Sequence, residues 1–188
     1  MNRPCSIDSK MTFQEAIAGT KAPRDVIDLL CLVAVRYWGF DDTLHEGQLI
    51  VHKSVKHDVA EIFSRIKTME FPIAKVVPIA KYAWSDDASM ADNNTSAFNY
   101  RFVAGTERLS HHAYGRAVDI NPLMNPVIYK SGNIDPPGAQ YDPNRAGTLS
   151  ESHVIVKEFL SRGWRWGGHF RSSLDYHHFD KPPGPGQP

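Results

Sequence analysis

Residues 110–119, with the sequence SHHAYGRAVD, place His112 seven positions before Asp119. These two polar residues are the first indication of the fold and chemistry of the chain. A second polar cluster, residues 175–180 with the sequence DYHHFD, lies near the end of the chain. Two imidazoles and one carboxylate form a typical catalytic zinc ligand set that leaves one position for water. An additional carboxylate can then move the proton of that water. The two clusters together therefore predict a hydrolytic zinc site.

Length and composition are those of one soluble globular domain. The chain has 188 residues, of which 41% are hydrophobic and 22% charged, and both values are ordinary. Basic and acidic residues are balanced at 21 each, which argues against a nucleic-acid binder that works through bulk positive charge. The longest apolar run, residues 26–40, contains Asp28 and Arg36 and is shorter than the ~20 apolar residues of a membrane span. We expect no nucleic-acid partner and no membrane span, and a monomer is favoured.

The start of the chain and its cysteines bear on the compartment. Residues 1–10 lack a basic stretch followed by an apolar core, so no secretory signal is recognised. We expect the cell envelope, periplasmic or extracellular, if a signal has been removed, and otherwise the cytoplasm until lysis. Cys5 and Cys31 leave open whether they pair, since two cysteines are not a disulfide framework. Cys31 lies in an apolar run and is expected to be a small buried hydrophobe.

Hydrophobic periodicity and turn residues predict three helices and six strands. The helices are expected over residues 23–38, 56–69 and 150–161, the last with Ser150 or Ser152 as its N-cap. In the second helix, one face carries Val59, Ile62, Phe63 and Ile66. The strands are expected over residues 48–51, 75–79, 97–103, 116–120, 163–166 and 176–179, with a long ordered loop over 121–144. Helices at the edges and strands concentrated in the second half favour an α+β fold.

The histidines beside the two acidic residues leave the ligand set open. His111 adjoins His112, and His177 adjoins His178. Neighbours on a strand face opposite ways, so only one of each pair can point at an ion, and spacing does not say which. Gly115 indicates that the backbone passes close to another group. Surface or hydrogen-bonded roles are expected for the other histidines, which are His45, His52, His57, His153 and His169.

Asp175 and His178 raise a geometric question of their own. They lie three positions apart, which places them on opposite faces of an ideal strand. If both side chains are to approach one ion, the strand must turn or bulge between them, with Asp175 still in the preceding turn. A strand that is regular through both residues would remove their shared role.

With these residues identified, the chain resembles the zinc peptidases of bacterial peptidoglycan, the family of VanY-like D-Ala-D-Ala carboxypeptidases and L-alanyl-D-glutamate endopeptidases. The family pattern Ser-x-His-x-x-Gly-x-Ala-x-Asp matches Ser110, His112, Gly115, Ala117 and Asp119 without a gap. The later pattern Asp-x-x-His-Phe matches Asp175, His178 and Phe179. Similar segments at residues 86–90, 93–101, 121–122 and 163–168 extend the resemblance from about residue 47 to residue 180.

The resemblance implies a fold and a set of roles. The fold is a small α+β domain, shared with the hedgehog signalling domain, in which a central antiparallel sheet carries zinc and is flanked by helices. His112, Asp119 and His178 would bind the zinc, Asp175 would act as general base and then acid, and Arg101 would bind the scissile carbonyl oxygen or its oxyanion. The chain would then divide into an N-terminal helical segment (1–46) packed on the domain, a zinc peptidase domain (47–180) and a disordered tail (181–188).

Several of these residues also have structural interpretations. Arg101 could form an ion pair with Asp86 or Asp87, and Ser110 is expected first to cap or orient the segment that carries His112. The aromatic residues near the site could form apolar walls or only pack in the core; they are Trp164, Trp166 and Phe179.

The function expected from the resemblance is zinc-dependent hydrolysis of peptidoglycan stem peptides, either as a D-Ala-D-Ala carboxypeptidase or as an L-Ala-D-Glu endopeptidase. The aspartate rather than glutamate at position 175 resembles the endopeptidase branch. The alternative is a catalytically inactive, zinc-containing module that binds cell wall or protein. Asp175 argues against that alternative, because a structural zinc site normally has four protein ligands and no use for a free base.

Overall fold

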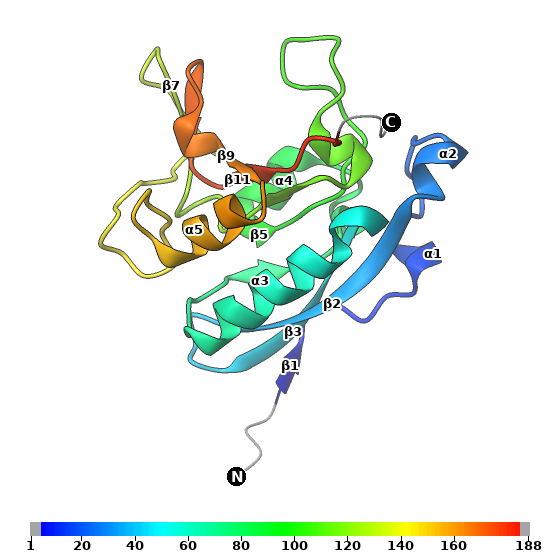
Figure 1. Cartoon of the computed structure of the whole chain (residues 1–188), viewed down its shortest axis with the longest axis horizontal. Helices are drawn as coiled ribbons and strands as arrows, with labels where there is room; N and C mark the ends of the chain where they lie inside the picture. Colours follow the sequence, from blue (N-terminus) through cyan, green and yellow to red (C-terminus); the bar gives the residue numbers. More distant parts are fainter. Residues whose placement is uncertain (1–4, 185–188) are drawn as a thin grey trace.

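Two long strands form the largest sheet of residues 5–184, the part of the chain that the computed structural model describes (Figure 1). Strand β2 (Leu30–Trp38) pairs antiparallel with β3 (Leu44–His52), and β1 (Cys5–Ile7) pairs with the other edge of β3 in parallel. Helix α3 (Lys56–Thr68) lies along one face of this ribbon and buries its predicted apolar face against it. The opposite face is covered by the N-terminal segment that contains α1 (Phe13–Ala16).

The helix predicted over residues 23–38 is wrong beyond its first turn. Helix α2 ends at Ile27 (Arg24–Ile27), and β2 follows. Burial in β2 alternates from Val33 onward, with Val35 and Tyr37 buried and Ala34 and Arg36 exposed. Alternation with β-branched residues is typical of a half-buried strand and outweighs the apolar run that suggested a helix. The N-terminal segment therefore contains strands as well as one-turn helices, and its predicted boundary after residue 46 falls inside β3.

The strand predicted over residues 97–103 is also wrong. The regular strand β5 (Asn94–Thr95) is shorter, lies earlier and pairs in parallel with β4 (Lys75–Val76). The groups that a ladder would use are bonded elsewhere, since the Phe98 amide donates to the Ile50 carbonyl and the Asn99 amide donates to the His112 carbonyl. The segment is thereby fixed beside the site without belonging to a sheet.

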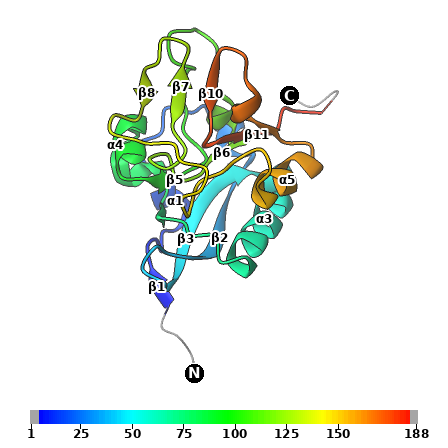
Figure 2. The same ribbon diagram turned by 90° about the vertical axis from the view of Figure 1, so that its left-hand side faces the viewer.

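The C-terminal half contains two further antiparallel sheets. One has β11 (His178–Asp180) between β6 (Ala117–Asp119) and β9 (Arg165–Trp166). The other has β7 (Val127–Tyr129) between β10 (Ser173–Asp175) and β8 (Ile134–Asp135), and it projects away from the β2–β3 ribbon (Figure 2). The predicted α+β class is confirmed, with the strands shared among several small sheets.

Helices and turns join these sheets. Helix α5 (Val154–Ser161) begins later than predicted, because His153 rather than Ser150 or Ser152 accepts the capping hydrogen bond. The loop predicted over residues 121–144 is ordered and contains the β7–β8 hairpin, and the buried side chains of Asn121 and Asn125 donate to backbone carbonyls on either side of it, at Ile120 and Gly147. The remaining short helices are η1 (Lys53–Val55), η2 (Ile79–Tyr82), α4 (Asp86–Ala91), η3 (His111–Tyr114) and η4 (Gly167–His169).

The aromatic residues considered as walls of the site belong to the hydrophobic core. Trp164, Trp166 and Phe179 are buried in the main core beside Phe159, so they pack the core. Cys31 is half-buried rather than buried, and it and Cys5 are free.

The end of the chain is tied to the domain as far as Lys181, whose ammonium lies 2.7 Å from a carboxylate oxygen of Asp58. The end of the tail predicted to be disordered, residues 185–188, lies outside the described residues. None of the helices in residues 5–184 has the length and apolar character needed to cross a membrane.

Candidate metal centre

His112 is placed by a short turn of helix with a defined beginning and end. The Ser110 hydroxyl accepts a hydrogen bond from the His112 amide at 3.3 Å, so Ser110 caps η3 as the sequence predicted. Gly115 ends the turn with a φ of 65°, a conformation that favours glycine. A Cβ at this position would lie 2.7 Å from the His52 amide nitrogen, so the predicted close backbone approach is confirmed.

Asp119 and His178 are brought together by strand register. In the antiparallel pair β6–β11, His178 lies directly opposite Asp119, and directly paired residues point to the same face of a sheet. The three residue pairs between these strands thus make neighbours of residues that are far apart in the sequence. Spacing along the chain contains no information about this register.

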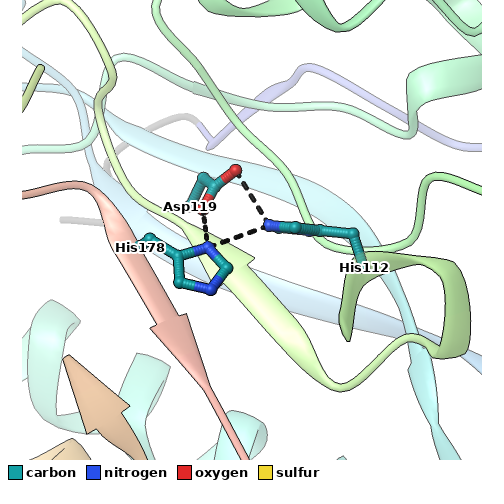
Figure 3. A group of neighbouring side chains, drawn as sticks. All are labelled: His112, Asp119 and His178. Atoms are coloured by element: carbon teal, nitrogen blue, oxygen red, sulfur yellow. Dashed lines mark hydrogen bonds and ion pairs between the residues drawn. The ribbon is translucent and has the colours of Figure 1, made fainter. Parts of the chain in front are cut away.

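The three predicted ligands converge on one point, as Figure 3 shows. His112 Nε2 lies 3.0 Å from Asp119 Oδ2, and His178 Nδ1 lies 3.0 Å from Asp119 Oδ1. The two ring nitrogens are 3.2 Å apart. His111 and His177 do not join this group, so the geometry selects one histidine from each pair.

The outer nitrogen of each ligand ring has its own partner. His112 Nδ1–H donates a short hydrogen bond to the Ala97 carbonyl, which can only accept. His178 Nε2–H faces Asp180 Oδ2 at 3.3 Å. In the neutral rings the inner nitrogens, Nε2 of His112 and Nδ1 of His178, then carry lone pairs that point at each other and at the Asp119 carboxylate. A metal ion bound there would satisfy all three ligand atoms at once.

Zinc fits this donor set. Ligands about 2.05 Å from a tetrahedral ion lie about 3.3 Å from one another, close to the separations observed here. Two imidazoles and one carboxylate are the ligands of many catalytic zinc sites, in which a fourth position is left for water or substrate. The His112 and Asp119 side chains are almost fully buried, so a bound ion would be held rigidly and reached from one side.

Electrostatics reinforce the arrangement of these side chains. Burial would raise the pKa of Asp119, but the charge and hydrogen bonds of the surrounding histidines hold it well below its ordinary value. Burial would lower the pKa of His178, but hydrogen bonds to Asp119 and Asp180 outweigh burial and raise that pKa to about 10. The cluster therefore keeps its carboxylates ionised and attracts positive charge.

Asp180 lies directly behind the candidate site, although no role is predicted for it from the sequence. Its carboxylate faces His178 and is bound by both arms of Arg165, with Nε at 2.7 Å and Nη2 at 2.8 Å. Burial opposes ionisation, but hydrogen bonds from His178 and Arg165 hold the pKa of Asp180 far below its ordinary value. A carboxylate behind a ligand histidine fixes the orientation of the ring. The available signal was the spacing, since residues i and i+2 of a strand share a face.

A cleft of about 620 Å³ opens onto the cluster. His112 and His178 line it together with Asp175 and Arg101. Asp175 is the last residue of β10, and a turn at residues 176–177 separates it from β11. The break that the sequence required between Asp175 and His178 is therefore present, and both residues face the same cleft.

Arg101 lies on the cleft and also makes the ion pair considered from the sequence. Its Nη2 is 2.8 Å from Asp86 Oδ2, and Asn99 donates to the other oxygen of that carboxylate at 3.2 Å. Its Nε is buried and has no hydrogen-bond partner among the described residues. Asp86 can thus orient the guanidinium while one N–H stays available.

The remaining histidines are accounted for by other contacts. His111 lines the cleft 3.4 Å from Arg165, and burial lowers the pKa of its ring. His52 accepts from the Ser54 amide, and His153 caps α5. His57 is exposed, and His45 bonds to Asp8 and Asp41. His169 is exposed, lies 3.5 Å from Glu151 and borders the cleft. These contacts agree with the hydrogen-bonded and surface roles expected.

Comparison with known proteins finds a match to one family model, over part of the chain. Residues 104–181 match the family model described as D-alanyl-D-alanine carboxypeptidase, which confirms the resemblance found in the motifs. The match includes the three converging residues and Asp175, but it begins after Arg101. No curated protein and no solved structure matches the chain.

Proposed function

We propose that this protein is a zinc-dependent peptidase that hydrolyses peptide bonds in peptidoglycan stem peptides. The observation that carries the proposal is the convergence of His112, Asp119 and His178 beside a cleft that also contains the carboxylate of Asp175. The family match supports peptidase activity in general. The metal, the bond cleaved and the roles of single residues are our proposal.

His112 Nε2, His178 Nδ1 and Asp119 would hold the zinc ion. A zinc ion bound there supplies Lewis acidity, which lowers the pKa of a coordinated water toward about 7 and polarises a carbonyl group. The chain contributes the rigidity of the site, because Ala97 and Asp180 fix the two ring orientations from behind.

Asp175 would move the proton. It borders the cleft beside the ligand cluster without belonging to the cluster, as a general base requires. In the proposed reaction its carboxylate takes a proton from the water that attacks the amide carbon. The same carboxylate then delivers that proton to the departing amine nitrogen as the C–N bond breaks.

Arg101 would stabilise the oxygen that becomes negative during the attack. Its guanidinium is oriented by Asp86 and lines the same cleft. A fixed positive group aimed at developing charge is usually a large contribution to catalysis. Arg108 and Arg171 also line the cleft and form no ion pair with any residue in the described range, which favours a substrate with free carboxylates such as a stem peptide.

The test is Asp175→Asn in zinc-loaded protein, assayed by mass spectrometry of purified muropeptides. We expect the variant to keep one zinc per chain and to lose roughly 10²–10⁴-fold in kcat, because only the proton transfer is removed. His57→Asn, an exposed histidine on α3, is the matched control and should leave activity unchanged.

The same digest separates the remaining possibilities. Loss of a terminal D-Ala identifies a carboxypeptidase, and cleavage between L-Ala and D-Glu identifies an endopeptidase. Muropeptides that stay intact with the zinc-loaded wild-type protein would overturn the proposal in favour of a binding module. Full activity of Asp175→Asn would refute the assignment of the base.

A further inference from the structure

His177 is buried next to the site, although the metal ligands leave it out. It lies in the turn between β10 and β11, and only 3% of its surface is exposed. Both ring nitrogens nevertheless have oxygen neighbours, with the Asn125 carbonyl 2.8 Å from Nδ1 and Asp175 Oδ1 3.1 Å from Nε2. A buried imidazole in contact with the proposed base calls for a functional explanation.

The Asn125 side fixes how the ring is oriented. A carbonyl oxygen can only accept, so Nδ1 carries a hydrogen and donates it. The Asn125 residue is itself held in place, because its side chain accepts from the Leu149 amide at 2.6 Å and donates to the carbonyls of Ile120 and Gly147. The imidazole is therefore attached to a rigid support, and its Nε2 is directed at Asp175.

The inner carboxylate oxygen of Asp175, Oδ1, has few other possible partners. This oxygen is buried, and no described residue gives it a well-aligned hydrogen bond, so the contact with His177 is an ion-pair distance without ideal alignment. The backbone behind it is closely packed, since a Cβ on Gly167 would lie 2.3 Å from the Asp175 carbonyl oxygen. Asp175 can thus adjust by rotation of its side chain and not by movement of its backbone.

We propose that His177 is a positioning residue for Asp175. The ring holds the inner carboxylate oxygen, Oδ1, by donating to it from an Nε2–H, so that the other oxygen remains turned to the cleft and to the attacking water. This inference rests on the proposed function, because it concerns the base of that reaction. A displacement of about 1 Å at a catalytic group can cost on the order of 10²-fold in rate, so a residue that prevents rotation has a measurable effect.

Two conservative variants separate the two ring contacts. The amide nitrogen of asparagine occupies the place of Nδ1, whereas that of glutamine occupies the place of Nε2. His177→Asn keeps the bond to Asn125 and loses Asp175, and His177→Gln keeps the contact with Asp175. We expect His177→Asn to lower kcat about 10–100-fold with little change in KM, and His177→Gln to restore most of kcat. Equal losses in both variants, or a loss in KM alone, would overturn the proposal.

A double-mutant cycle with Asp175→Asn tests whether His177 acts through Asp175. We expect His177→Asn to cause no further loss in the Asp175→Asn background, since the positioned group is already gone. An additional loss of the full size would show that His177 acts in some other way. Zinc content and melting temperature, measured for each variant, identify any change that comes from unfolding.

Crystal structures of the two variants give a readout that does not require activity. The Asp175 carboxylate should stay in place in His177→Gln and rotate away in His177→Asn. An unmoved Asp175 in His177→Asn would overturn the positioning role even if the wild-type protein hydrolyses no muropeptide. Failure of the proposed function, which is an inactive zinc-loaded wild type, is thereby distinguished from failure of this inference.

Discussion

Two of the clusters within residues 5–184 place carboxylates around a histidine, and of these two only the C-terminal one has the geometry of a metal site. In the N-terminal half, His45 Nδ1 lies 3.0 Å from Asp8 and Nε2 lies 3.1 Å from Asp41. The two carboxylates are thus on opposite sides of one ring. In the C-terminal half, single nitrogens of His112 and His178 point at the same carboxylate.

The difference shows that a metal site depends on whether the ligand atoms point at one position more than on which residue types are present. At His45 the two carboxylates lie on different ring nitrogens, so a ring with a hydrogen on each nitrogen can donate to both, and the cluster has no group of ligand atoms that converges on one point among the described residues. At the C-terminal cluster His112 Nε2, His178 Nδ1 and the Asp119 carboxylate converge on one point, while the outer ring nitrogens face the Ala97 carbonyl and Asp180. The first arrangement is an ion-pair clasp, and the second could hold a metal ion.

Their places in the fold explain the two outcomes. His45 lies on β3 next to Ser6 of β1, and Asp41 belongs to the turn between β2 and β3. The His45 clasp therefore joins the first strand of the chain to that turn. His112, Asp119 and His178 come from a capped turn and the paired strands β6 and β11, and the two histidines line a cleft. The second set therefore borders a cleft that a substrate can enter.

The largest expected effect comes from removing one ligand from each cluster in turn. We expect His112→Ala to abolish zinc binding and hydrolysis, since two ligands do not hold zinc in a catalytic site. His45→Ala should retain about one zinc per chain and full activity. Metal analysis of protein prepared without chelator and the muropeptide assay measure both. Zinc in His112→Ala, or its loss in His45→Ala, would contradict the comparison.

A smaller effect is expected from the carboxylate behind the ligand ring. Asp180→Asn removes the charge that faces His178 Nε2 while nearly preserving shape, and we expect zinc affinity to fall about 10–100-fold. Asp41→Asn, the corresponding change at His45, should leave zinc affinity unaltered. Competition with a metal-binding dye gives both values. Equal affinities in the two variants would show that Asp180 does not support the site.

Most of the site could be predicted from the sequence because its residues lie in short motifs. Ser110, Gly115 and the ligand histidine of the first motif depend on local turn geometry, which a contiguous segment specifies. Asp180 could have been found from strand alternation. His177 could not, because its contacts are the Asn125 carbonyl and Asp175, and the first depends on the path of a long loop.

The fold was less predictable where the signals competed. Residues 23–38 combine an apolar run with strand alternation, and the pairing of β2 with β3 decided between them. Residues 97–103 have a strand-like composition, but their backbone groups bond to Ile50 and to the turn that carries His112. In both cases the deciding contacts are distant in sequence, and a local pattern does not contain them.

The smallest expected effect is a pH dependence of stability that belongs to the His45 clasp. Burial disfavours the charged ring, but hydrogen bonds to Asp8 and Asp41 outweigh burial and raise the pKa of His45 above its ordinary value of 6.5. Tyr37, which stacks on the ring, and Thr43 are its other close neighbours. Because the folded-state pKa is raised, the clasp contributes its full stability below about pH 6.5 and loses it as pH rises through the folded-state pKa.

The variant that isolates this contribution is His45→Gln, compared with wild type in zinc-saturated protein. We expect the free energies of unfolding in urea to differ by about 0.5 kcal/mol near pH 6, since the pair is partly exposed and screened by solvent. The difference should shrink by about pH 9, and added salt should reduce it at the lower pH. A difference that grows as the pH rises would mean that His45 is held neutral. The contrast between a histidine that binds carboxylates through its own hydrogens and a cluster that binds a metal ion would then fail.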